Sequence, residues 1–169
     1  MATGTDAAES RVYITLRPES ADDEEFVRRL ILENVAAELG ATAWPEPMRT
    51  HQLGIQYTSR RQSHRDNYPG AGNRIAESGG QRAGWVVTAI LPDEVRLVDI
   101  IVPQALRGRG IGAAVIGAIL TEAATLNKPV RLHVNTANAG AIRLYERFGF
   151  KRIDGDELRH FMEARPAQE

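Results

Sequence analysis

The sequence of 169 residues predicts a mixed α/β fold, and three consecutive segments of its second half support this class. Residues 95–102 are rich in β-branched side chains, as expected of a strand that is buried on both faces. Residues 110–126 place apolar side chains on one helical stripe and end before Pro129. Residues 130–134 then alternate apolar and polar side chains, which is the period of a strand. Strands and helices that follow one another in this way are typical of mixed α/β domains.

Upstream of this unit we expect one strand followed by two helices. Residues 11–17 alternate in polarity and predict a half-buried strand. Four acidic residues at 22–25 precede apolar residues at helical spacing, which favours a helix that ends near Gly40. A proline-containing break at 44–47 separates it from a second predicted helix, which runs to about His64.

The middle of the chain predicts a β-hairpin. Residues 74–76 and 84–91 carry strand-like patterns and flank the pair Gly79-Gly80, which suits a tight turn. Further on, the segment 138–148 has one apolar helical face.

The end of the chain predicts two closing strands. The last helix stops at Gly149, a residue type suited to a left-handed C-terminal position. Short strands are expected at 150–153 and 159–162. We expect one domain over residues 11–165, with a leader at 1–10 and a tail at 166–169.

Composition narrows the class of function. The net charge of −1, from 21 basic and 22 acidic residues, gives no electrostatic pull towards nucleic acid or an anionic membrane. Without cysteine, the chain has no disulfide, no thiolate metal site and no cysteine nucleophile. No signal segment or membrane-spanning run occurs, so we expect a cytoplasmic protein.

The histidines do not indicate a metal site. They lack the short ligand spacing and the carboxylate-rich surroundings that metal sites use. These four residues are His51, His64, His133 and His160. We expect no metal; His133 lies in a predicted strand where it could line a cleft or be an ordinary packed side chain.

The strongest local signal is a glycine-rich loop at 107–112, between an apolar strand and an amphipathic helix. Glycines let the backbone approach a ligand, and the free amides of a helix N-terminus favour an anion such as a pyrophosphate. Arg107 and Arg109 could neutralise part of its charge. Ala113-Ala114 stand where a Walker loop needs lysine and serine or threonine, and the glycine spacing does not match a dinucleotide fingerprint. A tight structural turn is the alternative.

Two motifs resemble those of the GNAT superfamily of N-acetyltransferases. Its cofactor motif, Arg/Gln-x-x-Gly-x-Gly/Ala, is matched by Arg107, Gly110 and Gly112. Its second motif is matched by Asn138, Ala141, Tyr145, Gly149 and Phe150. The specific match covers about residues 95–150.

This resemblance implies a central, mostly antiparallel mixed sheet of about six to seven strands flanked by about four helices, with strands four and five splayed to admit acetyl-CoA. It also implies that strand backbone holds the pantetheine arm and that loop amides hold the pyrophosphate. The implied cofactor-binding residues are Ile100, Ile101, Val102, Arg107, Gly108, Arg109, Gly110, Ile111, Gly112, Asn138, Ala141 and Tyr145. Asn138 could equally be a helix N-cap.

Two residues are candidates for the proton transfers. Tyr145 is similar to the family's general acid, which protonates the departing thiolate; its alternative role is core packing. Asp99 is the only carboxylate within the apolar segment 95–102, so it is either the base or a buried group with a partner such as an arginine. Water is the alternative base.

We therefore expect an N-acetyltransferase that moves the acetyl group of acetyl-CoA directly to a primary amine, through a ternary complex. The acceptor can be a small molecule, a peptide or a protein, and a homodimer remains open. A non-catalytic acyl-CoA sensor or an interaction domain of the same fold is the alternative.

Overall fold

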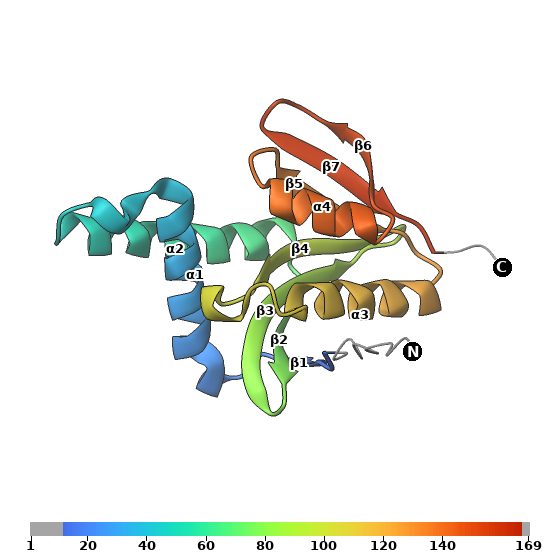
Figure 1. Cartoon of the computed structure of the whole chain (residues 1–169), viewed down its shortest axis with the longest axis horizontal. Coiled ribbons are helices and arrows are strands. Elements are labelled where there is room, and N and C mark those ends of the chain that lie inside the picture. Colours follow the sequence, from blue (N-terminus) through green and yellow to red (C-terminus); the bar gives the residue numbers. More distant parts are fainter. Residues whose placement is uncertain (1–11, 167–169) are drawn as a thin grey trace, which may run out of the picture.

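The computed structural model describes residues 12–166, which form a seven-stranded sheet with helices on both faces (Figure 1). The strands are β1 (Thr15–Pro18), β2 (Gly72–Ser78), β3 (Gln81–Ile90), β4 (Val95–Ile101), β5 (Val130–Asn135), β6 (Lys151–Gly155) and β7 (Arg159–Ala164). They lie in the order β1-β2-β3-β4-β5-β7-β6. Among the strands of residues 12–166, only the β4–β5 pair is parallel. The predicted mixed, mostly antiparallel class is confirmed.

Four α-helices and three short 3-10 helices connect the strands. The α-helices are α1 (Glu24–Leu39), α2 (Met48–Asn67), α3 (Ile111–Thr125) and α4 (Ala139–Arg147); the 3-10 helices are η1 (Ala21–Asp23), η2 (Ala41–Ala43) and η3 (Gln104–Leu106). All four predicted helices are confirmed. None of the helices in residues 12–166 has the length and apolar character needed to cross a bilayer.

Each face of the sheet has its own hydrophobic core, because side chains of a strand alternate between faces. On one face, Trp85 and Val87 of β3 pack with Ile31 of α1. On the other face, Val86 packs with Val115 of α3 and with α4 residues. Burying a large apolar side chain contributes about 1.5–3 kcal/mol, so these two cores fix α1 on one side and α3 and α4 on the other.

Strands β4 and β5 pair over only three residues and then separate. Val95, Arg96 and Leu97 pair with the three residues that begin β5 at Val130. Directly after this pairing, β4 has a bulge against β3, between Leu97 and Asp99. Within the described chain, residues 98–101 of β4 therefore have no strand partner on the β5 side, while β5 continues alongside β7 to Asn135. This is the predicted splaying of the fourth and fifth strands.

The first strand begins later than its alternation suggests. We expected a strand over 11–17, but β1 starts at Thr15, which pairs with Glu77 near the end of β2. Residues before Thr15 have no neighbouring strand within the described chain because β2 ends at Ser78. The apolar side chains of this segment still pack on the core. The expected leader at 1–10, together with Arg11, lies outside the described residues.

The predicted hairpin turn and helix end are confirmed by backbone geometry. Gly79 and Gly80 between β2 and β3 have φ of +57° and +75°, values that L-residues with a side chain rarely adopt. Gly149 after α4 has φ of +84°.

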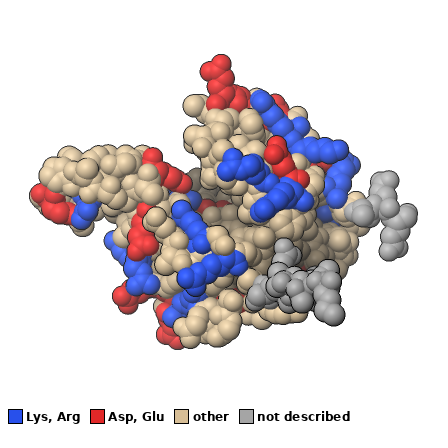
Figure 2. Space-filling model, in the orientation of Figure 1, with Lys and Arg blue, Asp and Glu red and all other residues tan. Residues whose placement is uncertain are grey.

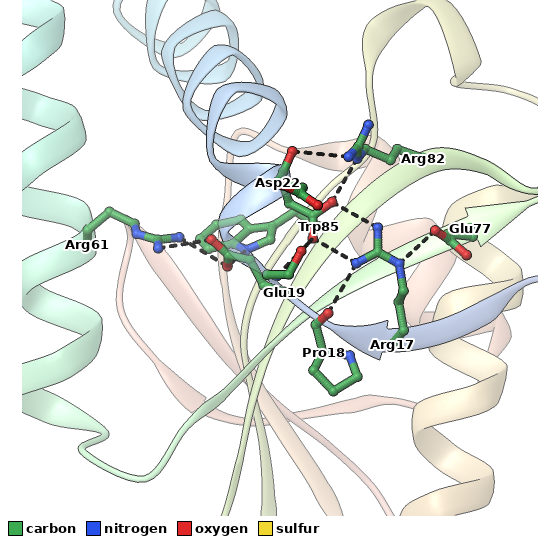
Figure 3. A network of polar contacts seen from close by, with 10 residues as sticks. Arg17, Pro18, Glu19, Asp22, Arg61, Glu77, Arg82 and Trp85 are labelled. Atoms are coloured by element: carbon green, nitrogen blue, oxygen red, sulfur yellow. Dashed lines mark hydrogen bonds and ion pairs between the residues drawn. The ribbon is translucent and has the colours of Figure 1, made fainter.

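A polar network anchors the start of α1 to the sheet (Figure 3). Asp23 is fully buried, and its carboxylate accepts hydrogen bonds from Arg17 at 2.7 and 2.8 Å and from Arg82 at 2.7 Å. The hydrogen bonds from Arg17 are the main cause that holds the pKa of Asp23 far below its usual range, against the opposing effect of burial. β1, β3 and the N-terminus of α1 are thus joined through one carboxylate.

Candidate functional site

The glycine-rich loop enters α3 through two left-handed glycines. Gly108 has φ of +74° and Gly110 has φ of +84°, so both use the conformational freedom that glycine alone offers. Gly110 is the residue that caps the N-terminus of α3, and its carbonyl accepts the first helical hydrogen bond, from the Ala114 amide at 3.0 Å. The chain therefore turns sharply from η3 into the helix.

This turn leaves a row of six free amides. Within the described residues, none of the amides of 108–113 donates a hydrogen bond to the protein. The Arg107 amide is not among them, because it donates to the Gln104 carbonyl at 3.2 Å. The free amides are therefore those of 108–113, whereas the family resemblance implied the amides of 107–112 as the pyrophosphate-binding groups. Free amides at the positive end of a helix dipole bind phosphate groups well.

Basic side chains lie on the surface around the free amides of 108–113. Figure 2 shows lysine and arginine side chains over α4 and over the segment that leads into α3, with a recess between the two groups. The arginines of these two segments are Arg107, Arg109, Arg143 and Arg147, all exposed. Arg107 also donates from Nε to the Val102 carbonyl at 3.1 Å, which ties the loop to the end of β4.

The open edge of β4 lies directly before this loop. Ile101 is buried against the α1 face, whereas Ile100 packs against the core on the α3 face. Their side chains are therefore engaged in packing, and only backbone groups of 98–101 face the gap left by β5. Such an edge can hydrogen-bond an extended, amide-containing ligand as a further strand would.

Asp99 stands in this open part of β4, on the face covered by α1 and α2. Its side chain is only 8% exposed, and Arg60 of α2 donates to both of its oxygens, from Nε at 2.7 Å and from Nη2 at 2.8 Å. Burial opposes the charged carboxylate, but hydrogen bonds from His64 and Arg60 outweigh it and lower the pKa of Asp99. Asp99 thus has a buried arginine partner, which is one of the two alternatives that the sequence left open.

His64 joins this group, which the sequence did not indicate. Its Nε2 lies 3.2 Å from Asp99 Oδ2, and its ring stacks on Trp85 at 5.9 Å between centroids. Its Nδ1 is buried without a hydrogen-bond partner in the described chain. One feature of the sequence could have indicated His64. It lies four residues after Arg60, and this spacing places both side chains on one face of a helix.

Tyr145 approaches β4 from the opposite face, on α4. It is 7% exposed and belongs to the core on the α3 face, where its ring lies 5.6 Å from that of Phe150. Burial, with the negative charge of Asp99 as a smaller cause, raises the pKa of Tyr145 to about 12. No hydrogen bond of its hydroxyl is formed within residues 12–166, so the phenol is a free, protonated donor at neutral pH.

Asn138 and Ala141 of the second motif build the start of α4. The Asn138 side chain accepts a hydrogen bond from the Ala141 amide at 3.1 Å. The N-cap alternative for Asn138 is confirmed, and this cap fixes the helix that carries Tyr145.

The remaining candidates have ordinary surroundings. His133 on β5 stacks on Phe161 of β7 at 4.5 Å, and burial, with nearby Arg96 and Arg159, lowers its pKa. Within residues 12–166 no group of three histidine or carboxylate side chains could hold a metal ion.

A parallel strand pair that separates beside a row of free helix-terminal amides offers room for an extended ligand that carries a phosphate group. Residues 33–150 match the model of the acetyltransferase (GNAT) family. The chain belongs to this family, and the predicted class of enzyme, an acetyl-CoA-dependent acyltransferase, is confirmed. No curated protein matches the chain by sequence.

Several solved structures share the fold. The PaiA N-acetyltransferase of Thermoplasma acidophilum, in complex with coenzyme A, has a TM-score of 0.69 and 18% identity over 91% of this chain and 99% of that one. The ribosomal-protein-S18-alanine N-acetyltransferase of Escherichia coli has a TM-score of 0.62 and 21% identity over 93% and 96%. YncA of Salmonella typhimurium, a putative acetyltransferase with its cofactor acetyl-CoA, has a TM-score of 0.60 and 19% identity over 93% and 96%.

Proposed function

We propose that this protein is an N-acetyltransferase that moves the acetyl group of acetyl-CoA directly to a primary amine in a ternary complex. The observation that carries the proposal is the row of six free amides at 108–113 next to the unpartnered edge of β4. The acceptor is the amine of a small molecule, a peptide or a protein. The S18 acetyltransferase of similar fold acts on an alanine of a ribosomal protein, which agrees with an amine acceptor.

The chain's own groups fit acetyl-CoA in two places. The amides of 108–113 suit its pyrophosphate, and exposed Arg107 and Arg109 add positive charge beside it. The backbone of 98–101 suits the amides of the pantetheine arm. A Cβ on Gly108 would meet nothing within 4 Å, so the loop leaves room for a ligand to approach. Acetyl-CoA supplies the thioester carbonyl and the thiolate leaving group.

Tyr145 acts as the acid in this proposal. As the acceptor nitrogen attacks the thioester carbon, the carbon–sulfur bond breaks and the sulfur needs a proton. The Tyr145 hydroxyl is protonated at neutral pH and has no competing hydrogen bond in the described chain, so it can donate one. Its place on the short helix α4 is fixed by the Asn138 cap.

Water removes the proton from the acceptor, with Asp99 as a positioning residue. Both Asp99 oxygens already accept hydrogen bonds from Arg60, and the lowered pKa makes this carboxylate a weak proton acceptor. Asp99 instead holds Arg60 and His64 beside the open part of β4.

Calorimetric titration of acetyl-CoA tests the cofactor site. We expect Gly108→Trp, whose side chain would occupy the open space at the loop, to abolish binding, and Arg109→Glu to weaken it about tenfold by placing negative charge beside the phosphates. Gly54→Trp and Arg49→Glu on α2 are the matched controls and should bind like the wild type. Binding that is unchanged in both loop variants would remove the loop from the site. A screen of amines with acetyl-CoA then identifies the acceptor class.

A further inference from the structure

The hairpin of β6 and β7 forms one edge of the sheet and carries the only Asp-Gly pair of the sequence, Asp154-Gly155. Figure 1 shows this hairpin in red, at the end of the sheet opposite β1. All residues of β6 are exposed. The backbone and the side chain of this pair are therefore open to water.

The amide of Gly155 does not take part in the hydrogen bonds between β6 and β7. The Asp156 amide donates to the Arg159 carbonyl at 2.9 Å, which makes these two residues a hydrogen-bonded pair of the antiparallel hairpin. Bonded and non-bonded pairs alternate along antiparallel strands, so the preceding pair, Gly155 and His160, is non-bonded. The Gly155 amide therefore points away from β7, towards the edge of β6, beside which no further strand of residues 12–166 lies.

The Gly155 amide is bonded instead to the carboxylate of the residue before it. It donates to Asp154 Oδ1 at 2.8 Å. Because Oδ1 is bonded to Cγ, this contact holds the amide nitrogen close to the carbon of the Asp154 carboxyl group. Glycine has no Cβ that would shield the nitrogen. A bond between these two atoms would close a five-membered ring.

The backbone around this pair is also weakly held. The pairing of β6 with β7 shifts register between Arg152 and Asp154, so Ile153 is the extra residue of a bulge, where the ladder is disrupted. Gly155 has φ of +129°, a value that glycine adopts without steric cost. Exposed segments with few ladder bonds open locally at a small fraction of the free energy of global unfolding. The nitrogen and Cγ can therefore reach the geometry of attack while the rest of the sheet stays folded.

We propose that Asp154-Gly155 is a modification site, at which the aspartate of the folded protein converts to isoaspartate. The Gly155 nitrogen attacks Asp154 Cγ, and the amide hydrogen leaves with the hydroxyl of the protonated carboxyl group as water, which closes a succinimide ring. Water then opens the ring. When the bond between the nitrogen and the backbone carbonyl carbon of Asp154 breaks, the product is isoaspartate, whose peptide bond runs through Cγ. When the bond to Cγ breaks, aspartate is restored.

Asp156, in the same hairpin, provides an internal comparison. Its Oδ1 accepts hydrogen bonds from the amides of Arg159 and Leu158, both at 2.8 Å. These bonds are the main cause that lowers the pKa of the Asp156 carboxyl, so the protonated form that reacts is rarer. The next residue is Glu157, whose side chain hinders the attacking nitrogen. We therefore expect Asp156 to stay unmodified.

Isoaspartate in β6 would disturb the tip of the hairpin, because it adds one carbon atom to the backbone. The tip holds the segment between β5 and α4. Thr136 donates from its amide to the Leu158 carbonyl at 3.0 Å and from Oγ1 to the Glu157 carbonyl at 2.7 Å. The modification should weaken both bonds and so loosen the segment that precedes the cap of α4.

Peptide mapping of the whole chain, aged at neutral pH, tests the site. Electron-transfer fragmentation distinguishes isoaspartate from aspartate, and a sample unfolded in guanidinium chloride gives the reference rate. Ageing continues until half of Asp154 in the unfolded sample has been converted. We expect the folded protein to form isoaspartate at Asp154 within about tenfold of this rate, because the segment opens locally, and Asp156 to remain aspartate. Folded protein without isoaspartate at Asp154, or with equal conversion of Asp156, would overturn the proposal.

Asp154→Glu is the blocking variant, and Asp93→Glu at an exposed turn is its matched control. Glutamate keeps the charge, but its extra methylene requires a six-membered ring, which forms far more slowly. We expect no isomer in β6 of Asp154→Glu and the wild-type rate at Asp154 in Asp93→Glu. An isomer that still forms in the hairpin of Asp154→Glu contradicts the assignment to Asp154.

Hydrogen exchange measures the effect on the fold. Chromatography separates the isoaspartate form from the unmodified protein. In the isoaspartate form we expect the Thr136 amide to exchange several-fold faster, while the amides of β2 and β3 exchange as before. Equal exchange of Thr136 in both forms would contradict the loosening of this segment. These measurements need no acetyl-CoA, so they are independent of the proposed acetyl transfer.

Discussion

Arg60 holds the Asp99 carboxylate with two nitrogens of its guanidinium, Nε at 2.7 Å and Nη2 at 2.8 Å. The pair joins α2 to the part of β4 that has no β5 partner. Arg60 also donates from Nη1 to Asn34 on α1 at 2.9 Å. One arginine therefore connects both helices of this face to the strand that borders the proposed reaction site.

Removing Arg60 should strongly destabilise the protein. Arg60→Ala leaves a buried carboxylate without its main partner, so we expect the free energy of unfolding to fall by about 3–5 kcal/mol. The double variant Arg60→Met/Asp99→Leu should recover most of this loss, because no buried charge remains. Urea denaturation measures both. Arg49→Ala breaks only an exposed pair with Glu46 and should change stability by less than about 1 kcal/mol; a similar loss in both single variants would contradict the prediction.

Stability should fall steeply in acid because of Asp23 and Asp99. The pKa of each carboxyl is lowered in the folded state, mainly by Arg17 for Asp23, and for Asp99 by His64 and Arg60 against burial. The folded state then binds fewer protons than the unfolded one. The stabilisation is present above pH of about 4 and is lost as pH falls below it.

Thermal unfolding between pH 6 and 2 measures this loss. In Asp23→Asn, the slope of the free energy of unfolding against pH should fall by the equivalent of up to about one bound proton. Asp66→Asn, at an exposed position of α2, is the control and should keep the wild-type slope. A wild-type slope in Asp23→Asn would show that another group causes the acid sensitivity.

Tyr145→Phe should separate catalysis from binding. Without the hydroxyl, we expect kcat to fall about 100-fold or more, while the Kd of acetyl-CoA stays the same because the ring still packs on Phe150. Since the pKa of Tyr145 is raised to about 12, the wild-type kcat should not decline through loss of this proton below pH of about 11. Steady-state kinetics with calorimetry checks both points. Unchanged turnover in Tyr145→Phe would favour water as the acid, and absence of turnover in the wild type would favour the acyl-CoA sensor.

Two glycines with positive φ should respond differently to alanine. At Gly155, which ends β6, an added Cβ would collide with the backbone of Arg159 and His160 on β7. At Gly149 the same atom would meet nothing within 4 Å. We expect Gly149→Ala to cost about 1 kcal/mol from its left-handed backbone and Gly155→Ala about 3 kcal/mol from the added collision. Equal unfolding free energies for the two variants would contradict this.

Local patterns in the sequence were sufficient for most of the fold. The alternation in 130–134, the helical stripe in 110–126 and the Gly79-Gly80 turn each depend on neighbours within a few residues, and the structure confirms them. The start of β1 could not be predicted in this way, because it depends on where β2 ends, some sixty residues later in the chain.

The same difference between local patterns and contacts of distant segments applies to the candidate site. The loop at 107–112 was predicted from glycines and context, but the hydrogen bond that engages the Arg107 amide depends on η3. Asp99 was expected to have a base role or a buried partner. Its actual partners, Arg60 and His64, lie on a helix 39 and 35 positions earlier in the sequence, and only the packing of α2 on the sheet brings them together.

The brief β4–β5 pairing divides the sheet into two parts. One part contains β1 to β4, and the other contains β5, β7 and β6, with only three residues of each strand joining them. A molecule that lies along 98–101 would act as the missing neighbour of β4 and bridge the two parts. The protein should then melt at a temperature that rises with the concentration of that molecule, and the amides of 98–101 should exchange their hydrogens more slowly when it is bound. A ligand that occupied this gap would thus become a structural component of the sheet.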